Sequence, residues 1–379
     1  MTELLYVRDG ALIHRDGEVE TPYRSAFAQE MEAQDRKSWE NNAWKAGRDD
    51  DPGAVVSRSM LWGSKGNRRP PQPLKIGHAV HAGRRWYYTL VMSHATGLFY
   101  YDTETKEEIR LFHRQGFASS PFCVLPDGRL VVTTTRSDGS TALTLLDASG
   151  VEREHLTEGD SLDQNPSFHD GWVYFNSIGL GRNSDGIVLA HAHSAVGRLG
   201  LESGEVEFLL DDEKFDYLLP RCTPGGVLYA LRMPHRAAHK TSPWQHVKDV
   251  ALFPVRLVVA LFGFLNVFST FFGKQPLTTA GGPDSTEDAR QRLLHQRLID
   301  VERESRQAGE KVAAPESWEL VRVTDGKTQV VARRVCTFDI AGETVIYSRG
   351  YDLCVVGEPA HHKGSELITS LSGADLKNV

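Results

Sequence analysis

The chain has 379 residues, of which 40% are apolar and 25% charged, and its formal net charge is −7. This composition excludes an intrinsically disordered chain and a polytopic membrane protein, and the acidic balance excludes nucleic-acid binding over the whole surface. The first twenty residues lack the basic stretch and apolar run of a signal peptide, and they indicate short strands with turns at Asp9-Gly10 and Asp16-Gly17. Together with four cysteines outside any CxxC pair, this predicts a cytoplasmic protein with reduced, buried thiols at Cys123, Cys222, Cys336 and Cys354.

A unit of two β-rich runs, each followed by a turn, recurs along the chain. The glycines at its first turn are Gly83, Gly128, Gly171, Gly226 and Gly342. Their separations are 45, 43, 55 and 116 residues. The first three separations match the roughly 40–50 residue period of propeller blades, and the last predicts a large insertion.

Two of these units carry a more specific pattern. Asn165–Gly171 reads Asn-Pro-Ser-Phe-His-Asp-Gly and precedes Val173-Tyr174-Phe175, and Phe122–Gly128 reads Phe-Cys-Val-Leu-Pro-Asp-Gly. Both segments resemble the WD40-like repeat of TolB-type six-bladed propellers. The resemblance covers about residues 75–235 and 317–370. It implies the fold and no function, and we expect neither the signal peptide nor the N-terminal domain of TolB.

The sequence therefore predicts a mainly β protein, built as a six-bladed β-propeller, with five or seven blades as alternatives. We expect residues 1–235 and 317–379 to form the propeller, with a helical excursion at 26–46 and a sixth blade made from the N-terminal strands. Residues 236–316 would form a helical insertion in the fifth blade. Within it, we expect an apolar helix at about 250–273 and a charged helix at about 285–311, which opens with a capping-box pattern.

The segment 250–273 is almost continuously apolar, with Arg256 as its one charge. As a helix it would be about 36 Å long, enough for the roughly 30 Å hydrocarbon core of a bilayer. Both halves of the fifth blade must lie in one compartment, however, so a single crossing is excluded. The remaining interpretations are a helix lying in one leaflet, a helix in a homo-oligomer interface, and a helix packed within the protein.

Local charge favours the membrane surface. Between Arg232 and Lys274 there are six basic residues and one acidic residue, which suits an anionic cytoplasmic leaflet. The predicted membrane or partner contacts are Trp244, Lys248, Phe253, Arg256, Leu257, Leu261, Phe264, Leu265, Phe268, Phe271, Phe272 and Lys274.

Motifs of catalysis are absent from the sequence, which contains no GxSxG nucleophile elbow, HExxH pair, Walker A loop or CxxC pair. His191 and His193 would share one face of a strand and could begin a metal site, but the sequence supplies no third ligand at a fixed spacing. We therefore expect no cofactor and no resident metal.

Ligands of propellers bind where inner strands meet loops at the mouth of the central channel. Polar residues directly before the predicted inner strands are the candidates for such a site: Asp163, Gln164, Asn165, Asp216, Tyr217, Arg221 and Arg334.

These observations predict a non-enzymatic propeller scaffold or recognition protein. It would be attached to the cytoplasmic face of a membrane through residues 236–275 and would bind a protein or a small ligand at the propeller face. Two alternatives remain: a metal-dependent propeller hydrolase or lactonase, and a homo-oligomer assembled through the apolar helix.

Overall fold

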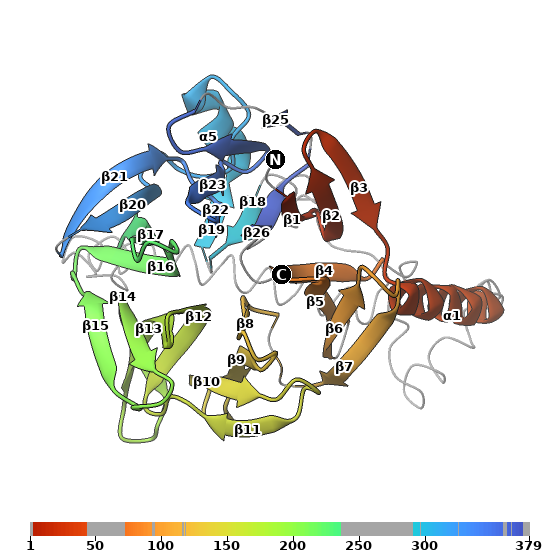
Figure 1. Ribbon diagram of the computed structural model, residues 1–379, viewed down its shortest axis with the longest axis horizontal. Coiled ribbons are helices and arrows are strands. Elements are labelled where there is room, and N and C mark those ends of the chain that lie inside the picture. The colour runs from red at the N-terminus through yellow and green to blue at the C-terminus, as the bar shows by residue number, and fades with distance from the viewer. Residues whose placement is uncertain are drawn as a thin grey trace, which may run out of the picture.

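The computed structural model describes residues 3–43, 73–92, 95–115, 117, 119–235, 291–295, 297–324, 326–358, 362–364 and 366–373. Most of the described strands form antiparallel meanders of four, and these lie around a common centre with the first strand of each meander innermost (Figure 1). The protein is therefore mainly β, as the sequence predicts.

The first three meanders contain strands β1 to β11 and the last described strand, β26. The terminal meander, which contains both the first and the last described strand, comprises β26 (Ile368–Gly373), β1 (Glu3–Arg8), β2 (Ala11–Asp16) and β3 (Val19–Tyr23). The second comprises β4 (Lys75–Ala82), β5 (Arg85–Val91), β6 (Thr96–Asp102) and β7 (Glu108–Arg114). The third comprises β8 (Cys123–Val124), β9 (Leu130–Thr135), β10 (Thr141–Leu146) and β11 (Glu152–His155).

The other three meanders follow in chain order. The fourth comprises β12 (Ser161–His169), β13 (Trp172–Arg182), β14 (Val188–Gly200) and β15 (Val206–Leu210), and a parallel pairing of β10 with β12 joins it to the third. The interrupted meander comprises β16 (Phe215–Cys222), β17 (Leu228–Pro234), β20 (Glu319–Thr324) and β21 (Lys327–Arg333). The last comprises β22 (Thr337–Ala341), β23 (Thr344–Ser348), β24 (Asp352–Val355) and β25 (His362–Lys363).

Turn chemistry explains how these meanders form. Gly128 and Gly171 lie between the first two strands of their meanders, with φ of 85° and 79°. This left-handed conformation strains any residue with a Cβ, so Asp-Gly at these positions favours the turn. The two positions confirm the turns that the repeat pattern predicts.

The hydrophobic core consists of clusters that lie between neighbouring meanders. Leu5, Val7 and Leu12 of the terminal meander pack against Ile76 and other residues of the second. On its other side, the same meander packs Leu4, Tyr6 and Leu371 against Ile346 and Leu353 of the last meander. The terminal meander is therefore buried between the first and the last parts of the rest of the chain.

Helix α1 (Ala26–Ala43) follows β3 and extends away from the meanders (Figure 1), within the segment 26–46 where the sequence predicts a helical excursion. Its first turn is held by the carboxylate of Glu108, which accepts hydrogen bonds from the backbone N–H groups of Ala26 at 2.9 Å and Phe27 at 3.0 Å. The same carboxylate accepts a bond from the Tyr23 hydroxyl at 2.7 Å. A carboxylate at a helix N-terminus satisfies otherwise unpaired N–H groups.

The prediction of a charged helix at 285–311 is wrong for residues 291–300. These residues form a hairpin of β18 (Gln291–Leu294) and β19 (Arg297–Asp300), and a short helix, α5 (Val301–Ala308), begins only after Asp300 caps it. Leu294 and Ile299 are buried in one cluster with Trp318, so tertiary packing overrides the helical pattern of this charged segment.

The predicted apolar helix at 250–273 and all twelve predicted membrane contacts lie outside the described residues. Within the described part of the chain, no helix is long and apolar enough to cross a membrane. Strands β17 and β20, which flank the insertion in the sequence, pair directly, from Leu228↔Val323 to Arg232↔Glu319.

Candidate functional site

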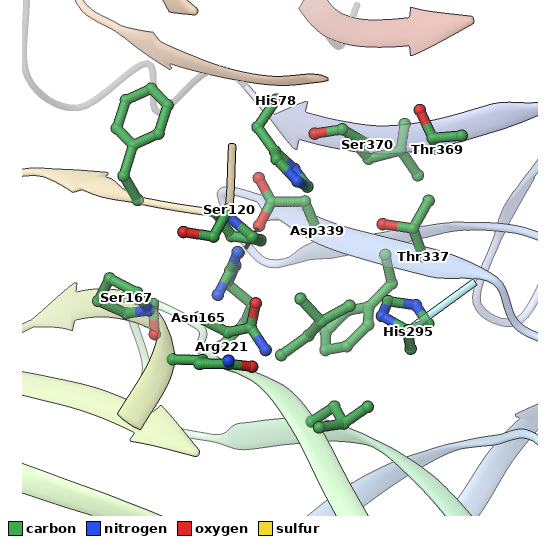
Figure 2. A pocket seen from close by; sticks show the side chains of 18 of the residues that line it. His78, Ser120, Asn165, Ser167, Arg221, His295, Thr337, Asp339, Thr369 and Ser370 are labelled. Atoms are coloured by element: carbon green, nitrogen blue, oxygen red, sulfur yellow. Dashed lines mark hydrogen bonds and ion pairs between the residues drawn. The ribbon is translucent and has the colours of Figure 1, made fainter. Parts of the chain in front are cut away.

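A cavity of about 900 Å³ lies at the centre of the meanders and is called the central cavity below. Its wall includes residues of β4, β12, β16, β22 and β26, together with the loop before β8. Eight serine or threonine side chains and five histidines line it, next to the charged residues Asp216, Arg221, Arg297 and Asp339. Figure 2 shows several of these side chains converging on the cavity from different strands.

Bulges in the inner strands shape this wall. The pairing of β4 with β5, of β12 with β13 and of β16 with β17 shifts by an extra residue beside the cavity. In β12 and β16 the bulge contains Pro166 and Pro220, preceded by Asn165 at φ 58° and Leu219 at φ 53°. Proline has no N–H to donate, so a bulge on an inner edge strand accommodates it. The Pro220 carbonyl then accepts a bond from Ser167 Oγ at 2.6 Å.

The main charged contact in the wall joins Arg221 of β16 to Asp339 of β22. Arg221 Nε donates to Asp339 Oδ1 at 3.0 Å, and the backbone N–H of Gly373 donates to Asp339 Oδ2 at 2.9 Å. Burial raises the pKa of Asp339, although Arg221 and the backbone donors oppose this shift. One carboxylate therefore links two meanders and the C-terminal strand.

Burial lowers the pKa of three of the lining histidines, His78, His81 and His295, so these imidazoles are neutral at pH 7. Burial lowers the pKa of His78 to about 4, and the charges of His295 and Arg221 act in the same direction. Burial also lowers the pKa of His295, whose Nε2 lies 2.6 Å from the carbonyl oxygen of Cys336. Figure 2 shows His78, His295 and Asp339 among the side chains that line the cavity. The wall thus offers neutral imidazoles next to a compensated ion pair.

A second polar group lies where the insertion begins and ends. Asp216 Oδ1 lies 2.9 Å from His235 Nδ1 and accepts a bond from the backbone N–H of Ser194 at 2.8 Å. Asp216 Oδ2 contacts the guanidinium of Arg297, which also donates to the Pro234 carbonyl at 3.0 Å. These contacts balance the negative charge of Asp216, the second acidic residue of the cavity, and they hold β19 to β16 and β17.

Four of the seven residues predicted for the channel mouth line the central cavity, namely Gln164, Asn165, Asp216 and Arg221. The other three lie elsewhere. Asp163 is buried and accepts a bond from Ser177 Oγ at 2.6 Å, Tyr217 is buried between two meanders, and Arg334 pairs with Glu316 at 3.3 Å. Sequence order places all seven near inner strands, but strand alternation turns Asp163 and Tyr217 away from the cavity.

The predicted histidine pair is split between the cavity and the surface beside it. His191 lines the central cavity, whereas His193 contacts Asp211. In the part of the chain that the structure describes, no group of three or more His, Cys, Asp or Glu residues could hold a metal ion.

The thiols in and near the cavity are poor nucleophiles. Cys123 and Cys336 line it, and burial raises the pKa of both thiols well above the usual range. None of the four cysteines forms a disulfide; three are buried and Cys222 is half-buried, which corrects the prediction for that residue. Since the thiolate is the nucleophilic form, neither lining thiol is set up for covalent catalysis.

Sequence reasoning missed His78, His295, Arg297 and Asp339 as residues of the cavity. Asp339 stands in an ordinary strand pattern, and its partner Arg221 lies 118 positions away. A usable signal is present in the dipeptides Asn165-Pro166 and Leu219-Pro220. Proline inside an inner strand indicates a bulge, and bulges often lie next to functional sites.

No family model matches this chain, and no curated protein sequence was found to match it. Among solved structures, it is similar to TolB from Acinetobacter baumannii, with 9% sequence identity and a TM-score of 0.49 over 99% of this chain and 67% of TolB. It is similar to a chain of the nidogen/laminin complex, with 10% identity and a TM-score of 0.47 over 99% and 98% of the two chains. The tricorn protease is similar with 12% identity and a TM-score of 0.45, over 97% of this chain and 34% of the protease.

All three TM-scores are below 0.5, so the fold assignment rests on the strand pairing and not on these neighbours. Antiparallel meanders of four strands, packed face to face around a central cavity, are the arrangement of a propeller. At the level of the fold, the described residues form a β-propeller.

Proposed function

We propose that this protein is a non-enzymatic recognition protein, a closed six-bladed propeller whose ligand site is the central cavity. The observation that carries this proposal is the wall of the cavity, where hydroxyl groups, neutral imidazoles and two compensated charge clusters converge from separate meanders. A cavity of about 900 Å³ lies within the range of ligand sites, roughly 300–1,000 Å³.

Among the described residues, the wall offers many hydrogen-bonding groups, and neither its two thiols nor Ser167 is arranged as a nucleophile. The lining thiols are protonated, and the hydroxyl of Ser167, which faces the cavity, donates to a carbonyl oxygen instead of to a general base. Nucleophilic catalysis requires such a base within hydrogen-bond reach. The arrangement therefore suits reversible binding of a small polar ligand or of a polar protein segment.

A thermal-shift screen of small polar compounds and short peptides tests this proposal. A ligand that binds only the folded state raises the midpoint temperature of unfolding. At a ligand concentration of 100 times Kd, the free energy of unfolding rises by about 2.7 kcal/mol. We expect saturable stabilisation of the wild type and loss of that response in Arg221→Met. Arg334→Met is the matched control, because Arg334 does not line the cavity.

Three results would contradict the proposal. One is the absence of any stabilising compound, and another is an equal response of Arg221→Met and Arg334→Met. The third is hydrolysis of esters or lactones that depends on an added divalent cation, which would replace the proposal by the hydrolase alternative.

We further propose that residues 236–275 attach the propeller to the cytoplasmic face of a membrane. The support is the sequence alone, namely the apolar run 250–273 and the excess of basic residues around it. The deletion that tests this must spare residues 291–316, because Leu294 and Ile299 belong to the core. A flexible glycine- and serine-rich linker from the end of β17 to the start of β18 replaces residues 237–289.

Cosedimentation with anionic and neutral lipid vesicles provides the measurement. We expect the full chain to bind anionic vesicles and the deletion variant to stay in solution with unchanged thermal stability. If the full chain instead forms a defined oligomer in detergent-free buffer and ignores vesicles, the homo-oligomer alternative replaces membrane attachment. A full chain that is monomeric and ignores vesicles contradicts both.

A further inference from the structure

The two carboxylates that line the central cavity are already compensated by the protein. Asp339 accepts bonds from Arg221 Nε at 3.0 Å and from the backbone N–H of Gly373 at 2.9 Å. Asp216 contacts the guanidinium of Arg297 and has two further partners, described above. Among the described residues of the wall, a bound cation would therefore find no unpaired carboxylate.

Arg221, in contrast, has one nitrogen that the protein does not use. Its Nε donates to Asp339, and its Nη1 donates to the carbonyl oxygen of Pro220 at 2.9 Å. Nη2 has no hydrogen-bond partner among the described residues and is not buried. The side chain is 17% exposed and lines the central cavity. A charged N–H group is therefore open to a ligand oxygen, and bonds from arginine to a carboxylate are among the stronger hydrogen bonds.

Two neutral imidazoles lie within electrostatic reach of this guanidinium. Burial lowers the pKa of His78, and the charges of His295 and Arg221 lower it further. The three residues line the central cavity together (Figure 2). His295 Nε2 donates to the Cys336 carbonyl at 2.6 Å, so Nδ1 of its neutral ring is an acceptor that can take up a proton. Both rings can thus become cations when the surrounding charge changes.

An anion would disturb the charge balance of the cavity. The ionised side chains among its described lining residues are Asp216, Arg221, Arg297 and Asp339, and their charges cancel. A buried charge without compensation is costly, so an anion at Arg221 favours a new positive charge nearby. Protonation of His78 or His295 supplies that charge. One monoanion and one proton leave the net charge unchanged, whereas a dianion needs two protons.

The titratable and charged groups that face these imidazoles come from several elements. They are His78 and His81 of β4, Cys123 of β8, His191 of β14, Asp216 and Arg221 of β16, His235 after β17, His295 and Arg297 of the hairpin β18–β19, Cys336 before β22, and Asp339 of β22. Asp339 competes with the imidazoles for a proton, because burial raises its pKa. A test of proton uptake must therefore separate an imidazole from this carboxylate.

With the central cavity as the ligand site, as proposed above, we propose that its ligand is a small monocarboxylate that binds together with one proton. The carboxylate binds Arg221 Nη2, and the pair His78 and His295 takes up the proton from solvent. Thr337 and Thr369 add hydroxyl donors to the wall (Figure 2). No bond of the ligand forms or breaks, so binding is reversible.

Titration calorimetry of the full chain tests this proposal. The probes are lactate, pyruvate and benzoate, with lactamide and benzamide as neutral counterparts and with succinate and inorganic phosphate as dianions. Each titration is run at pH 5.5 and 7.5, in two buffers that differ in heat of ionisation and contain no carboxylate or phosphate. We expect saturable one-to-one binding of at least one monocarboxylate and much weaker binding of its amide.

The pH dependence follows from the histidine pair. If the bound carboxylate returns the pKa of His78 from about 4 to the ordinary 6.5, the affinity rises about tenfold from pH 7.5 to pH 5.5. Comparison of the two buffers should then show uptake of about 0.9 proton at pH 5.5 and about 0.1 proton at pH 7.5.

Point variants locate the carboxylate and the proton. Arg221→Met removes the charged donor, so we expect an affinity about tenfold lower or more at both pH values. The double variant His78→Asn, His295→Asn should bind the carboxylate at pH 7.5 but show neither the gain at pH 5.5 nor the proton uptake. Each single histidine variant provides a second test if the double variant unfolds. His169→Asn is the matched control, because His169 is half-buried on β12 and does not line the cavity.

The proposal fails if no monocarboxylate binds, if the amides or dianions bind as tightly, or if binding takes up no proton at pH 5.5. It also fails if the double histidine variant keeps the pH dependence and Asp339→Asn loses it, because the proton then goes to the carboxylate. Binding of neutral compounds or peptides that depends on Arg221, with no response to carboxylates, would overturn the monocarboxylate and leave the central cavity as the ligand site. If neither carboxylates nor any other compound binds, both proposals fail.

Discussion

Two of the meanders are assembled from segments that lie far apart in the sequence, and they are joined in different ways. In the interrupted meander, the hairpin β16–β17 pairs with the hairpin β20–β21, so each half arrives with a local partner. In the terminal meander, β1, β2 and β3 arrive together, whereas β26 enters alone and pairs from Leu4↔Gly373 to Arg8↔Ile368.

This difference shows where each meander depends on the rest of the chain. The terminal meander depends on one strand of six residues that has no hairpin partner of its own. The interrupted meander depends on the side chains that fill the space beside its junction, which come from β18, β19 and α5. Asp339 connects the two, since it binds Arg221 of β16 and the backbone of Gly373 in β26.

Removal of residues 367–379 should have the largest effect, because it deletes β26. Ile368 and Leu371 are 1% and 6% exposed, and loss of one such side chain costs about 2–5 kcal/mol. We expect a drop of at least about 4 kcal/mol in the free energy of unfolding, measured by urea denaturation, or loss of the cooperative transition. Leu189→Ala is the control, since Leu189 is 68% exposed. A loss below about 1 kcal/mol would show that the terminal meander does not need its last strand.

Ile299→Ala tests the interrupted meander. Ile299 is 4% exposed in the cluster around Trp318, so we expect a loss of about 2–4 kcal/mol in the free energy of unfolding. Ile187→Ala is the matched control, because Ile187 is 59% exposed. Equal stability of the two variants would mean that the hairpin β18–β19 is appended to the meander and does not support it.

The comparison also shows what the sequence can predict. Turns such as Asp127-Gly128 and Asp170-Gly171 carry their own local signal, so the repeated strands, α1 and the pairing of the meanders around a centre could be expected from the sequence. The hairpin at 291–300 could not be predicted in the same way. Its charged residues suit an exposed helix, and only its burial against Trp318 selects strands.

The central cavity shows the same limit for the candidate site. Arg221 was identified because it lies next to a predicted inner strand. Asp339 was missed, because the closeness of β16 and β22 arises from the arrangement of the whole chain. Strand alternation decides that Asp163 is turned away while Gln164 lines the cavity, and a bulge shifts this alternation at Asn165.

Glu108→Gln tests how the outer edge of the terminal meander is held. Burial alone would raise the pKa of Glu108, but bonds from Tyr23 of β3 and from the first N–H groups of α1 outweigh it and lower the pKa. We expect the free energy of unfolding to fall by about 1–2 kcal/mol at neutral pH, measured by urea denaturation. A lowered pKa stabilises the fold above the ordinary value of 4.5, and this contribution disappears as the pH falls through the folded-state pKa.

The difference between wild type and Glu108→Gln should therefore shrink below about pH 4.5. Glu154→Gln is the control, because Glu154 is exposed on β11, and it should show no such pH dependence. If the difference in free energy of unfolding between wild type and Glu108→Gln stays constant from neutral to acidic pH, the ionised carboxylate does not hold the helix.

Asp339→Asn should have the smallest effect and tests the link between the two meanders. Burial raises the pKa of Asp339, so between the ordinary value of 3.8 and the raised value the folded state binds more protons than the unfolded state. Stability contributed by this group then falls as the pH rises through that interval. We expect the wild type to lose stability relative to Asp339→Asn on going from acidic to neutral pH, by less than about 1 kcal/mol, since the pair is partly open to solvent.

Urea denaturation at a series of pH values measures this difference, and Arg221→Met sharpens it. Without the guanidinium, the pKa of Asp339 should rise further, so the stability of Arg221→Met should fall more steeply with pH than that of the wild type. A wild type that instead gains stability over Asp339→Asn with rising pH would show that attraction to Arg221 exceeds the effect of burial. The contact between β16, β22 and β26 would then be an ion pair that actively holds the two assembled meanders together.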